Sequence, residues 1–339
     1  MAVAGSFVPF ACIERGGIAE SYHFGTAVLA DAAGRVHARW GDPDVVTFPR
    51  SALKPFQAVD LIESGAFDAF GLESEHLALA CASHNGESFH AERVEAWLEH
   101  LGCDESCLVC GPALPGRPEA ANAYLRDGLP PSPVLYNCSG KHCGFLTNAR
   151  HLGLPIADYD APDHILQQRY RAALSRFIDR SAEDLPWSRD DCMLPAPALP
   201  MRDMASAMAR FCEMAEAGAE AAPARILEAM RAHPLLLAGT GGLPQALSAV
   251  LGGRIVAKTG AEGFLAVFLP SERLGLTLKV ADGSARVRDA VLVAILRQIG
   301  MIDEEAGSAL LARVAPPLLD SRRQPVAVIR SILPSAEGA

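Results

Sequence analysis

The chain has 339 residues, with 40 acidic and 30 basic side chains, a formal charge of -10 at pH 7 and 50% hydrophobic residues. This length predicts one large domain or two with a sizeable core, and the composition excludes a disordered chain. A negative charge without a basic run excludes the electrostatic footprint of a protein that binds nucleic acid or an anionic membrane. Because the sequence shows no apolar run of about 18 residues and no positive segment before its apolar start, we expect a cytoplasmic protein.

The positions of the cysteines and the small number of lysines indicate the chemistry of the chain. The nine cysteines are an odd number spread from position 12 to position 212, which predicts reduced thiols rather than a disulfide framework. Arginine occupies the ordinary basic positions, because only four of the 30 basic residues are lysines: Lys54, Lys141, Lys258 and Lys279. Since arginine essentially never deprotonates, such a chain keeps lysine where a neutral amine or a compact ammonium is needed. A bias in genome composition is the alternative explanation.

The first half of the chain predicts strands followed by helices. Residues 7–14, 22–30 and 34–40 alternate or run apolar, with a D-A-A-G turn at 31–34, and predict a β-hairpin opening. Ser51 is an N-cap candidate before an apolar face at helical spacing, so a helix is predicted from there. Apolar periodicity predicts further helices at 88–101, 139–151, 161–179, 203–218 and 224–232.

After residue 252 the pattern changes to strands. The runs R-I-V-A-K-T-G, G-F-L-A-V-F-L-P and L-G-L-T-L-K-V-A-D-G follow in close succession and predict an antiparallel meander. Helices at 284–300 and near 303–313 and a last strand at 324–331 complete the chain. The total is an α+β fold, with an antiparallel sheet built from both chain ends and a helical middle region. We expect a single large domain of two lobes, a sheet lobe of about 1–50 and 252–339 and a helical lobe of about 51–251.

Three short motifs carry candidate catalytic groups: S-A-L-K at 51–54, S-H-N at 83–85 and K-T-G at 258–260. On a helix, Ser51 and Lys54 share a face, so a neutral lysine amine can take the serine proton as the oxygen attacks a carbonyl. A K-T-G strand would bring the amine of Lys258 beside that serine, and Ser83 and Asn85 would supply a hydroxyl and an amide nearby. The three motifs resemble, in the same chain order, the signature of penicillin-binding proteins and serine β-lactamases.

The three motifs differ in specificity. By composition, S-x-x-K is expected about 0.25 times in this chain and K-T-G about 0.006 times, so K-T-G is the sharper observation. Each motif also has a structural reading: Ser51 as a helix cap, Asn85 with Gly86 as a turn, and Thr259 with Gly260 as a strand end.

The third lysine lies in N-C-S-G-K-H-C-G at 137–144. Cys138 and Lys141 are three residues apart, so in the first turn of a helix their sulfur and amine face the same way. A tetrahedral zinc site needs a further ligand, and Cys192 in D-D-C-M-L-P is a candidate. Lysine is a rare ligand because its amine must first lose a proton. The alternative is that Cys138 and Cys143 are small buried side chains and that Lys141 pairs with a carboxylate.

Four segments together resemble the rhizobial-type L-asparaginases over nearly the whole chain: A-C-A-S-H-N-G-E at 80–87, N-C-S-G-K-H-C-G at 137–144, D-D-C at 190–192 and K-T-G-A-E-G at 258–263. That family is similar in fold to serine β-lactamases and glutaminases and hydrolyses L-asparagine to L-aspartate and ammonia. The resemblance implies a homodimer and two serine–lysine tandems, Ser51 with Lys54 and Ser83 with Lys258. It further implies a zinc ion, Zn2+, held by Cys138, Lys141 and Cys192.

Other residues in or beside these motifs are candidates for contacts with the substrate: Arg50, His84, Asn85, His142, Asp190, Gly260 and Glu262. Asp190 is a plausible partner for the substrate α-ammonium group. The chain departs from the family pattern at Asp191, where the family usually has glycine, and this carboxylate could alter substrate affinity or the approach to the metal.

The mechanism expected is attack by Ser51, activated by Lys54, on the side-chain amide, with Ser83 as the alternative nucleophile. The nearest rival substrate is glutamine, one methylene longer, and other small amides or β-lactams are further rivals. A non-catalytic zinc-binding protein on this scaffold is the rival of a different class. The C-L-V-C segment at 107–110, with Cys103 upstream, has the spacing of a redox motif or a second metal site, but the apolar Leu108 and Val109 suit a buried segment better.

Overall fold

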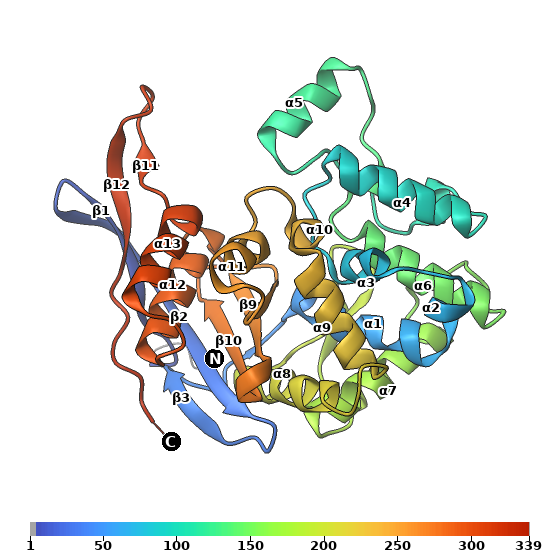
Figure 1. The fold of residues 1–339 in the computed structure, drawn as a ribbon, viewed down its shortest axis with the longest axis horizontal. Helices are drawn as coiled ribbons and strands as arrows, with labels where there is room; N and C mark the ends of the chain where they lie inside the picture. Colours follow the sequence, from blue (N-terminus) through green and yellow to red (C-terminus); the bar gives the residue numbers. More distant parts are fainter. Residues whose placement is uncertain (1–4, 339) are drawn as a thin grey trace. The chain divides into compact units, whose positions relative to one another are not determined.

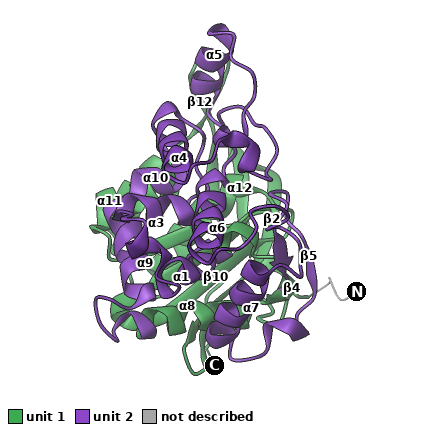
Figure 2. Cartoon of the chain, turned by 90° about the vertical axis from the view of Figure 1, so that its right-hand side faces the viewer, with its two compact units in different colours: residues 1–52, 199–213, 241–339 green, residues 53–198, 214–240 purple. Residues whose placement is uncertain are grey.

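The computed structural model describes residues 5–338 of the chain. The chain divides into two compact units, drawn in green and purple in Figure 2. The first unit consists of residues 1–52, 199–213 and 241–339, and the second of residues 53–198 and 214–240. The first unit therefore includes two segments, 199–213 and 241–251, that the sequence pattern placed in the helical lobe.

The first unit contains an eight-stranded antiparallel sheet in the order β11-β12-β1-β2-β10-β9-β8, with β3 paired to β2 (Figure 1). Its strands are β1 Val8–Arg15, β2 Ile18–Asp31, β3 Val36–Trp40, β8 Val256–Thr259, β9 Phe264–Leu269, β10 Leu274–Val280, β11 Leu318–Leu319 and β12 Pro325–Ser331. A separate short pair joins β4 Val46–Thr47 to β7 Leu199–Pro200. The structure confirms the predicted α+β fold, its sheet built from both chain ends, and the meander of β8, β9 and β10.

At β9 both faces of this sheet are covered, since all six residues of that strand are buried. On one face, Leu265 and Val267 pack in a core with Val291 of α12. On the other face, the ring of Phe268 lies 5.3 Å from that of Phe211 on α8, and Lys258 is in register with Ala266. Lys258 therefore lies on the sheet face that α8 covers. The helices of this unit are α8 Met201–Ala215, of which residues 201–213 belong to it, α11 Leu243–Leu251, α12 Ala285–Gln298 and α13 Glu304–Val314.

The second unit is helical and packs around α6, in which the eleven consecutive residues Ser139–Ala149 are buried. At Gly140 a side chain would collide with the backbone of Leu79 on α3, so glycine permits this close approach. The helices are α1 Lys54–Glu63, α2 Ala66–Ala69, α3 Ser74–Cys81, α4 Ser88–His100, α5 Pro118–Arg126, α6 Ser139–His151, α7 Ile165–Ile178, α9 Ala222–Ala232 and α10 Pro234–Ala238. A short hairpin joins β5 Trp187–Arg189 to β6 Pro195–Pro197.

The prediction of Ser51 as an N-cap is wrong. Ser51 lies within a 3-10 turn, Arg50–Leu53, and α1 begins at Lys54. The reason is Pro55, which lacks an N–H group and is tolerated only in the first turn of a helix. Among residues 5–338, no helix is both long and apolar enough to cross a membrane.

Candidate active site

The centre of the candidate site in the second unit is a buried lysine bonded to a serine. Lys54, the first residue of α1, is fully buried, and its amine donates a hydrogen bond to the Ser83 hydroxyl at 3.1 Å. The same amine donates to the backbone carbonyls of Ala82 and, at 3.3 Å, of Asn137. Burial lowers the pKa of Lys54. Sequence spacing did not predict the contact between Lys54 and Ser83.

Backbone hydrogen bonds fix the segment that carries Ser83. It follows the end of α3, and the Ser83 amide donates to the Leu237 carbonyl at 2.9 Å. The next amide, of His84, donates to the Asn137 carbonyl at 3.3 Å. Asn137 thus accepts hydrogen bonds from both this segment and Lys54. Although Asn137 lies inside a motif noted in the sequence, no role was assigned to it.

His84 stabilises this segment through hydrogen bonds at both of its ring nitrogens. The Gly86 amide donates to Nδ1 at 3.2 Å, so Nε2 carries the proton and donates to the Ser139 hydroxyl at 2.9 Å. Burial holds the pKa of His84 well below its usual range, which favours this neutral form. The partners of the His84 ring are therefore protein groups, and its contribution is to position the loop after Ser83.

Asn85 and Glu87 follow on the same loop. The Glu87 carboxylate accepts a hydrogen bond from the Thr240 amide at 2.9 Å, and a Cβ at Gly239 would collide with the Asn85 amide group. Within the described part of the chain, Asn85 Oδ1 is buried without a hydrogen-bond partner. Such an acceptor is available to a donor on a bound ligand.

The three residues of the predicted zinc site lie together in the second unit. Cys138 precedes α6, Lys141 is in its first turn, and Cys192 lies in the turn between β5 and β6. The Lys141 amine donates a hydrogen bond to Cys192 Sγ at 2.7 Å. A hydrogen bond from Cys192 lowers the pKa of Cys138 well below its usual range, against the effect of burial. Burial lowers the pKa of Lys141, but the charges of Cys192 and Cys138 raise it overall.

The chemistry of these donors fits zinc. Two sulfur atoms and one nitrogen are ligand types that Zn2+ takes in tetrahedral sites, and three protein ligands leave a fourth position open. Among residues 5–338, no three His, Cys, Asp or Glu side chains cluster in a way that could hold a metal, so a metal bound by Cys138 and Cys192 would need the Lys141 amine as its third donor. The hydrogen bond between Lys141 and Cys192 shows that the two donors already face each other.

Two acidic residues precede Cys192 in its turn. The Asp190 amide donates to the Leu194 carbonyl at 2.9 Å, and the Asp190 carboxylate accepts from the Asp191 amide at 2.8 Å. The negative charge of Asp190 contributes to raising the pKa of Lys141, which places that carboxylate near the thiol cluster. Asp191, the departure from the family pattern, is exposed. His142, next to Lys141 in the chain, is buried and bonds through Nδ1 to the Tyr159 hydroxyl at 2.7 Å.

The remaining predicted catalytic residues, Ser51 and Lys258, belong to the first unit. At Gly260 a Cβ would collide with the Pro49 carbonyl, so the end of the K-T-G strand lies against the backbone just before Ser51. Lys258 is buried and donates to the Thr259 carbonyl at 2.8 Å. Arg50, which precedes Ser51, has a left-handed backbone with φ of 50°.

The fourth lysine supports the loop after K-T-G. Lys279 on β10 donates to the backbone carbonyls of Glu262 and, at 2.7 Å, of Val280. Glu262 is exposed and has a left-handed backbone with φ of 53°. Burial lowers the pKa of Lys279, against the neighbouring charges of Glu262 and Asp282. The scarcity of lysine in the sequence does not by itself indicate this role of Lys279.

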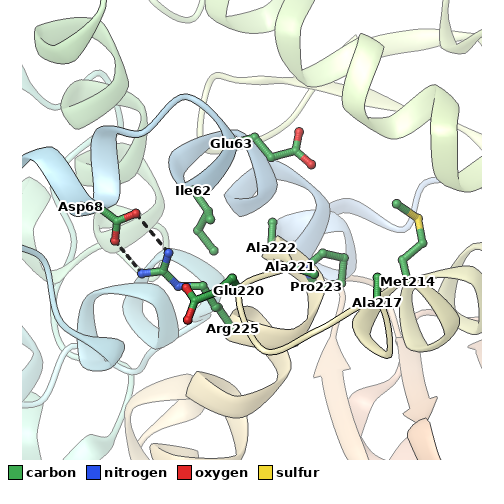
Figure 3. Close-up of a pocket in the computed structure, with 10 residues that line it drawn as sticks. All are labelled: Ile62, Glu63, Asp68, Met214, Ala217, Glu220, Ala221, Ala222, Pro223 and Arg225. Atoms are coloured by element: carbon green, nitrogen blue, oxygen red, sulfur yellow. Dashed lines mark hydrogen bonds and ion pairs between the residues drawn. The ribbon is translucent and has the colours of Figure 1, made fainter.

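A separate pocket of about 450 Å³ in the second unit contains none of the predicted site residues (Figure 3). Arg225 of α9 and Asp68 of α2 face each other there and form an ion pair with distances of 2.8 and 3.2 Å. Its wall is otherwise mostly small and apolar, with Glu63 and Glu220 as the other acidic residues. No nucleophile or base with a serine or cysteine partner lines this pocket, so the motif residues remain the candidate catalytic groups.

Comparisons with known proteins identify the family. The family model described as L-asparaginase II matches residues 11–331. The chain therefore belongs to the L-asparaginase II family. A search of curated proteins found no match.

Several solved structures are similar to the chain at low identity. A structure titled as Mglu in its native form shares 16% identity with a TM-score of 0.47, covering 82% of this chain and 65% of its own. A putative β-lactamase from Bacteroides dorei shares 11% identity with a TM-score of 0.40, covering 86% of this chain and 95% of its own. A β-lactamase from Mycobacterium bovis shares 13% identity with a TM-score of 0.33, covering 81% and 94%. The chain thus spans less than two thirds of the length of the Mglu chain.

Proposed function

We propose that this protein hydrolyses L-asparagine to L-aspartate and ammonia through a covalent serine intermediate. The observation that carries this proposal is the hydrogen bond between the buried Lys54 amine and the partly buried Ser83 hydroxyl, in a chain that belongs to the L-asparaginase II family. Such a pair holds an amine and a hydroxyl where a proton can pass between them.

In the first half-reaction, the Ser51 oxygen attacks the side-chain amide carbon while Lys54, three residues later in the chain, takes the hydroxyl proton. The Lys54–Ser83 hydrogen bond supports a relay in which Ser83 passes this proton to the leaving nitrogen, so that ammonia departs and an aspartyl ester remains on Ser51. In the second half-reaction, water attacks the ester and the proton returns to Ser51 Oγ. We assign Lys258 to support the second proton transfer, because it is a buried amine on the strand whose end, at Gly260, lies against the backbone just before Ser51.

We further propose that Cys138, Lys141 and Cys192 hold Zn2+. Bound zinc would supply a positive charge that binds and orients a carboxylate or amine of the substrate. Asp190, which lies near these donors, would bind the α-ammonium group of asparagine. The free Oδ1 acceptor of Asn85 would receive a donor from the same ligand. His84 and His142 support the protein segments around the site, because the side chains of both form hydrogen bonds with protein groups.

The test is ammonia release from L-asparagine and, in parallel, from L-glutamine by the purified protein at millimolar substrate and neutral to alkaline pH. We expect release from asparagine to exceed release from glutamine by at least about tenfold, since a methylene in a pocket changes rates by about 10–200-fold. Preference for glutamine would make the protein a glutaminase. Absence of activity on both amides in a folded, zinc-loaded protein would favour the binding-protein alternative.

The nucleophile is assigned by trapping an acylated protein with a slow substrate and locating the added mass by peptide mass spectrometry. We expect the ester on Ser51, its loss in Ser51→Ala, and its retention in Ser271→Ala, a matched change at an exposed serine. An ester on Ser83 in the wild type would reverse the roles of the two serines.

We also propose that the protein is a cytoplasmic homodimer. Cell fractionation tests its location, and light scattering on the purified protein tests its oligomeric state.

A further inference from the structure

Glu87 lies at the end of the loop that carries Ser83 and Asn85, and both oxygens of its carboxylate have protein partners. Oε2 accepts the hydrogen bond from the Thr240 amide at 2.9 Å, and Oε1 accepts one from the Arg117 guanidinium at 3.3 Å. The Glu87 side chain is only 12% exposed. Because its two oxygens bond to two different segments of the chain, Glu87 is placed to hold these segments against the loop.

The loop that carries Ser83 is bonded at both of its ends to one segment, residues 237–240. At the first end, the Ser83 amide donates to the Leu237 carbonyl at 2.9 Å. At the second end, Glu87 accepts from the Thr240 amide. The first bond joins two main-chain groups, whereas the second depends on a side chain. A substitution of Glu87 therefore removes the second bond and leaves the first.

Between these two bonds, the segment packs directly against the side chain of Asn85. A Cβ at Gly239 would lie 2.2 Å from Asn85 Oδ1 and 2.3 Å from Nδ2, so only glycine permits this approach. Gly239 immediately precedes Thr240, whose amide bonds to Glu87. This bond therefore holds Gly239 against the amide group of Asn85, whose Oδ1 is buried and has no hydrogen-bond partner in the described part of the chain.

A second segment, just before α5, contacts the same loop. The Gly116 amide donates to the Asn85 carbonyl at 2.6 Å, and Arg117 forms the ion pair with Glu87. The Arg117 side chain is 35% exposed, so water can replace this ion pair in part and its contribution is small. Burial raises the pKa of Glu87, but the hydrogen bond from Thr240 and the charge of Arg117 lower it overall, so Glu87 is a carboxylate at neutral pH.

We propose that Glu87 is a positioning residue of the active site, which holds the Asn85 amide where it binds the substrate. This inference rests on the proposed function, in which Asn85 Oδ1 accepts a hydrogen bond from asparagine. Glu87 acts through Thr240 and Gly239, and its own oxygens bond to protein groups. Loss of Glu87 would displace Asn85 and weaken substrate binding, whereas Ser83 keeps its own hydrogen bonds.

The experiment compares three substitutions of Glu87 by steady-state kinetics on asparagine, with circular dichroism to confirm folding. Glu87→Ala removes the carboxylate, Glu87→Asp keeps the charge but is one methylene shorter, and Glu87→Gln keeps the length and an oxygen that can accept from Thr240. We expect KM to rise at least about tenfold in the alanine and aspartate variants, with kcat within about threefold, and KM in Glu87→Gln to stay within about threefold of the wild type. Glu119→Gln is the matched control, because it removes an exposed carboxylate that pairs with the same Arg117.

A merely structural role of Glu87 would give a different pattern. A variant that is only partly folded lowers kcat in proportion to the folded fraction and leaves KM unchanged. Hydrogen–deuterium exchange adds a readout that does not depend on activity. The amides of residues 237–240 should exchange faster in Glu87→Ala and Glu87→Asp than in the wild type, Glu87→Gln and Glu119→Gln.

Two outcomes would overturn this role of Glu87 while the proposed function stands. One is a wild-type KM in both Glu87→Ala and Glu87→Asp, in a protein that hydrolyses asparagine. The other is unchanged exchange of residues 237–240 in these two variants. If the wild type released no ammonia from asparagine, the proposed function and this role would both be wrong, so the two failures are distinguishable.

Discussion

The amine of Lys54 and the hydroxyl of Ser83 are hydrogen-bonded at 3.1 Å, although the two residues are 29 positions apart in the chain. Because Lys54 starts α1 and Ser83 follows the end of α3, the packing of these two helices determines the distance. In the proposed mechanism, the two side chains therefore act as one proton-transferring pair.

This relationship predicts non-additive mutations. Lys54→Met should lower kcat/KM by about 10³-fold and Ser83→Ala by about 10²-fold, in the range of general acid–base catalysis. The double variant should be about as slow as Lys54→Met alone, because residues that act as a unit lose their function together. Steady-state kinetics on asparagine measure this, with circular dichroism to confirm folding. Losses that multiply in the double variant would show that the two residues act independently.

The fold was largely predictable because its long elements are strongly periodic. The prediction for α6, 139–151, matches the observed bounds, and the meander of β8, β9 and β10 was predicted from its apolar runs. Short helices such as α2 and α10 were not predicted, because four or five residues give too little periodicity. The start of α1 was misplaced since the N-cap signal of Ser51 competes with the requirement of Pro55 for the first turn.

The sequence motifs predicted that Cys138, Lys141 and Cys192 lie together, but they did not predict which groups form hydrogen bonds with each other. Cys138 and Lys141 share a helix turn, so their proximity follows from spacing, whereas Cys192 reaches them only because the β5–β6 turn is folded onto α6. The role of Asn137 depends on its backbone carbonyl, which no side-chain pattern reveals. Contacts of this kind depend on tertiary packing and are absent from local sequence signals.

Removal of the metal should separate binding from chemistry. If Cys138, Lys141 and Cys192 hold zinc that orients the substrate, chelation should raise KM for asparagine by at least about tenfold while kcat changes by less than about threefold. Metal analysis should find one zinc per chain in the wild type and in Cys212→Ser, a buried control outside the cluster, and much less in Cys192→Ser. An unchanged KM after zinc removal would contradict a substrate-orienting role.

The contact between Gly260 and Pro49 should be sensitive to a single methyl group. In Gly260→Ala the new Cβ would collide with the Pro49 carbonyl, and the backbone before Ser51 would have to shift. We expect a loss of about 1–3 kcal/mol in the free energy of unfolding, typical of overpacking, and at least a tenfold loss in kcat/KM. Gly111→Ala is the matched control, because its Cβ would enter open space. Equal kinetics in the two variants would show that this contact does not position Ser51.

Lys279 should affect the reaction through the loop that it supports. Lys279→Met removes the hydrogen bonds to the carbonyls of Glu262 and Val280, so the loop after K-T-G should loosen and KM should rise more than kcat falls. Lys279→Arg, which keeps the charge and the donors, should restore part of the loss. Arg322→Met is an exposed control. If the methionine and arginine variants were equally impaired, the shape of the side chain rather than its hydrogen bonds would be responsible.

Acid should destabilise the protein through buried histidines. His90 is buried, its ring stacks on that of His84 with centroids 4.7 Å apart, and burial lowers its pKa to about 4. Burial is the dominant cause, while Glu87, just before α4, raises this pKa and Arg93 on α4 lowers it. The unfolded chain binds the proton near pH 6.5 and the folded one only near pH 4, so stability is lost as the pH falls through this window.

The size of this effect provides the test. The shift corresponds to a loss of about 3 kcal/mol in the free energy of unfolding between pH 6.5 and pH 4. Denaturant titrations at pH 7, 6, 5 and 4.5 should show this slope in the wild type and in His100→Gln, a control at an exposed histidine. His90→Leu should flatten the slope without abolishing it, since burial also depresses the pKa of His84. A slope that is the same in His90→Leu and the wild type would mean that other groups cause the acid sensitivity.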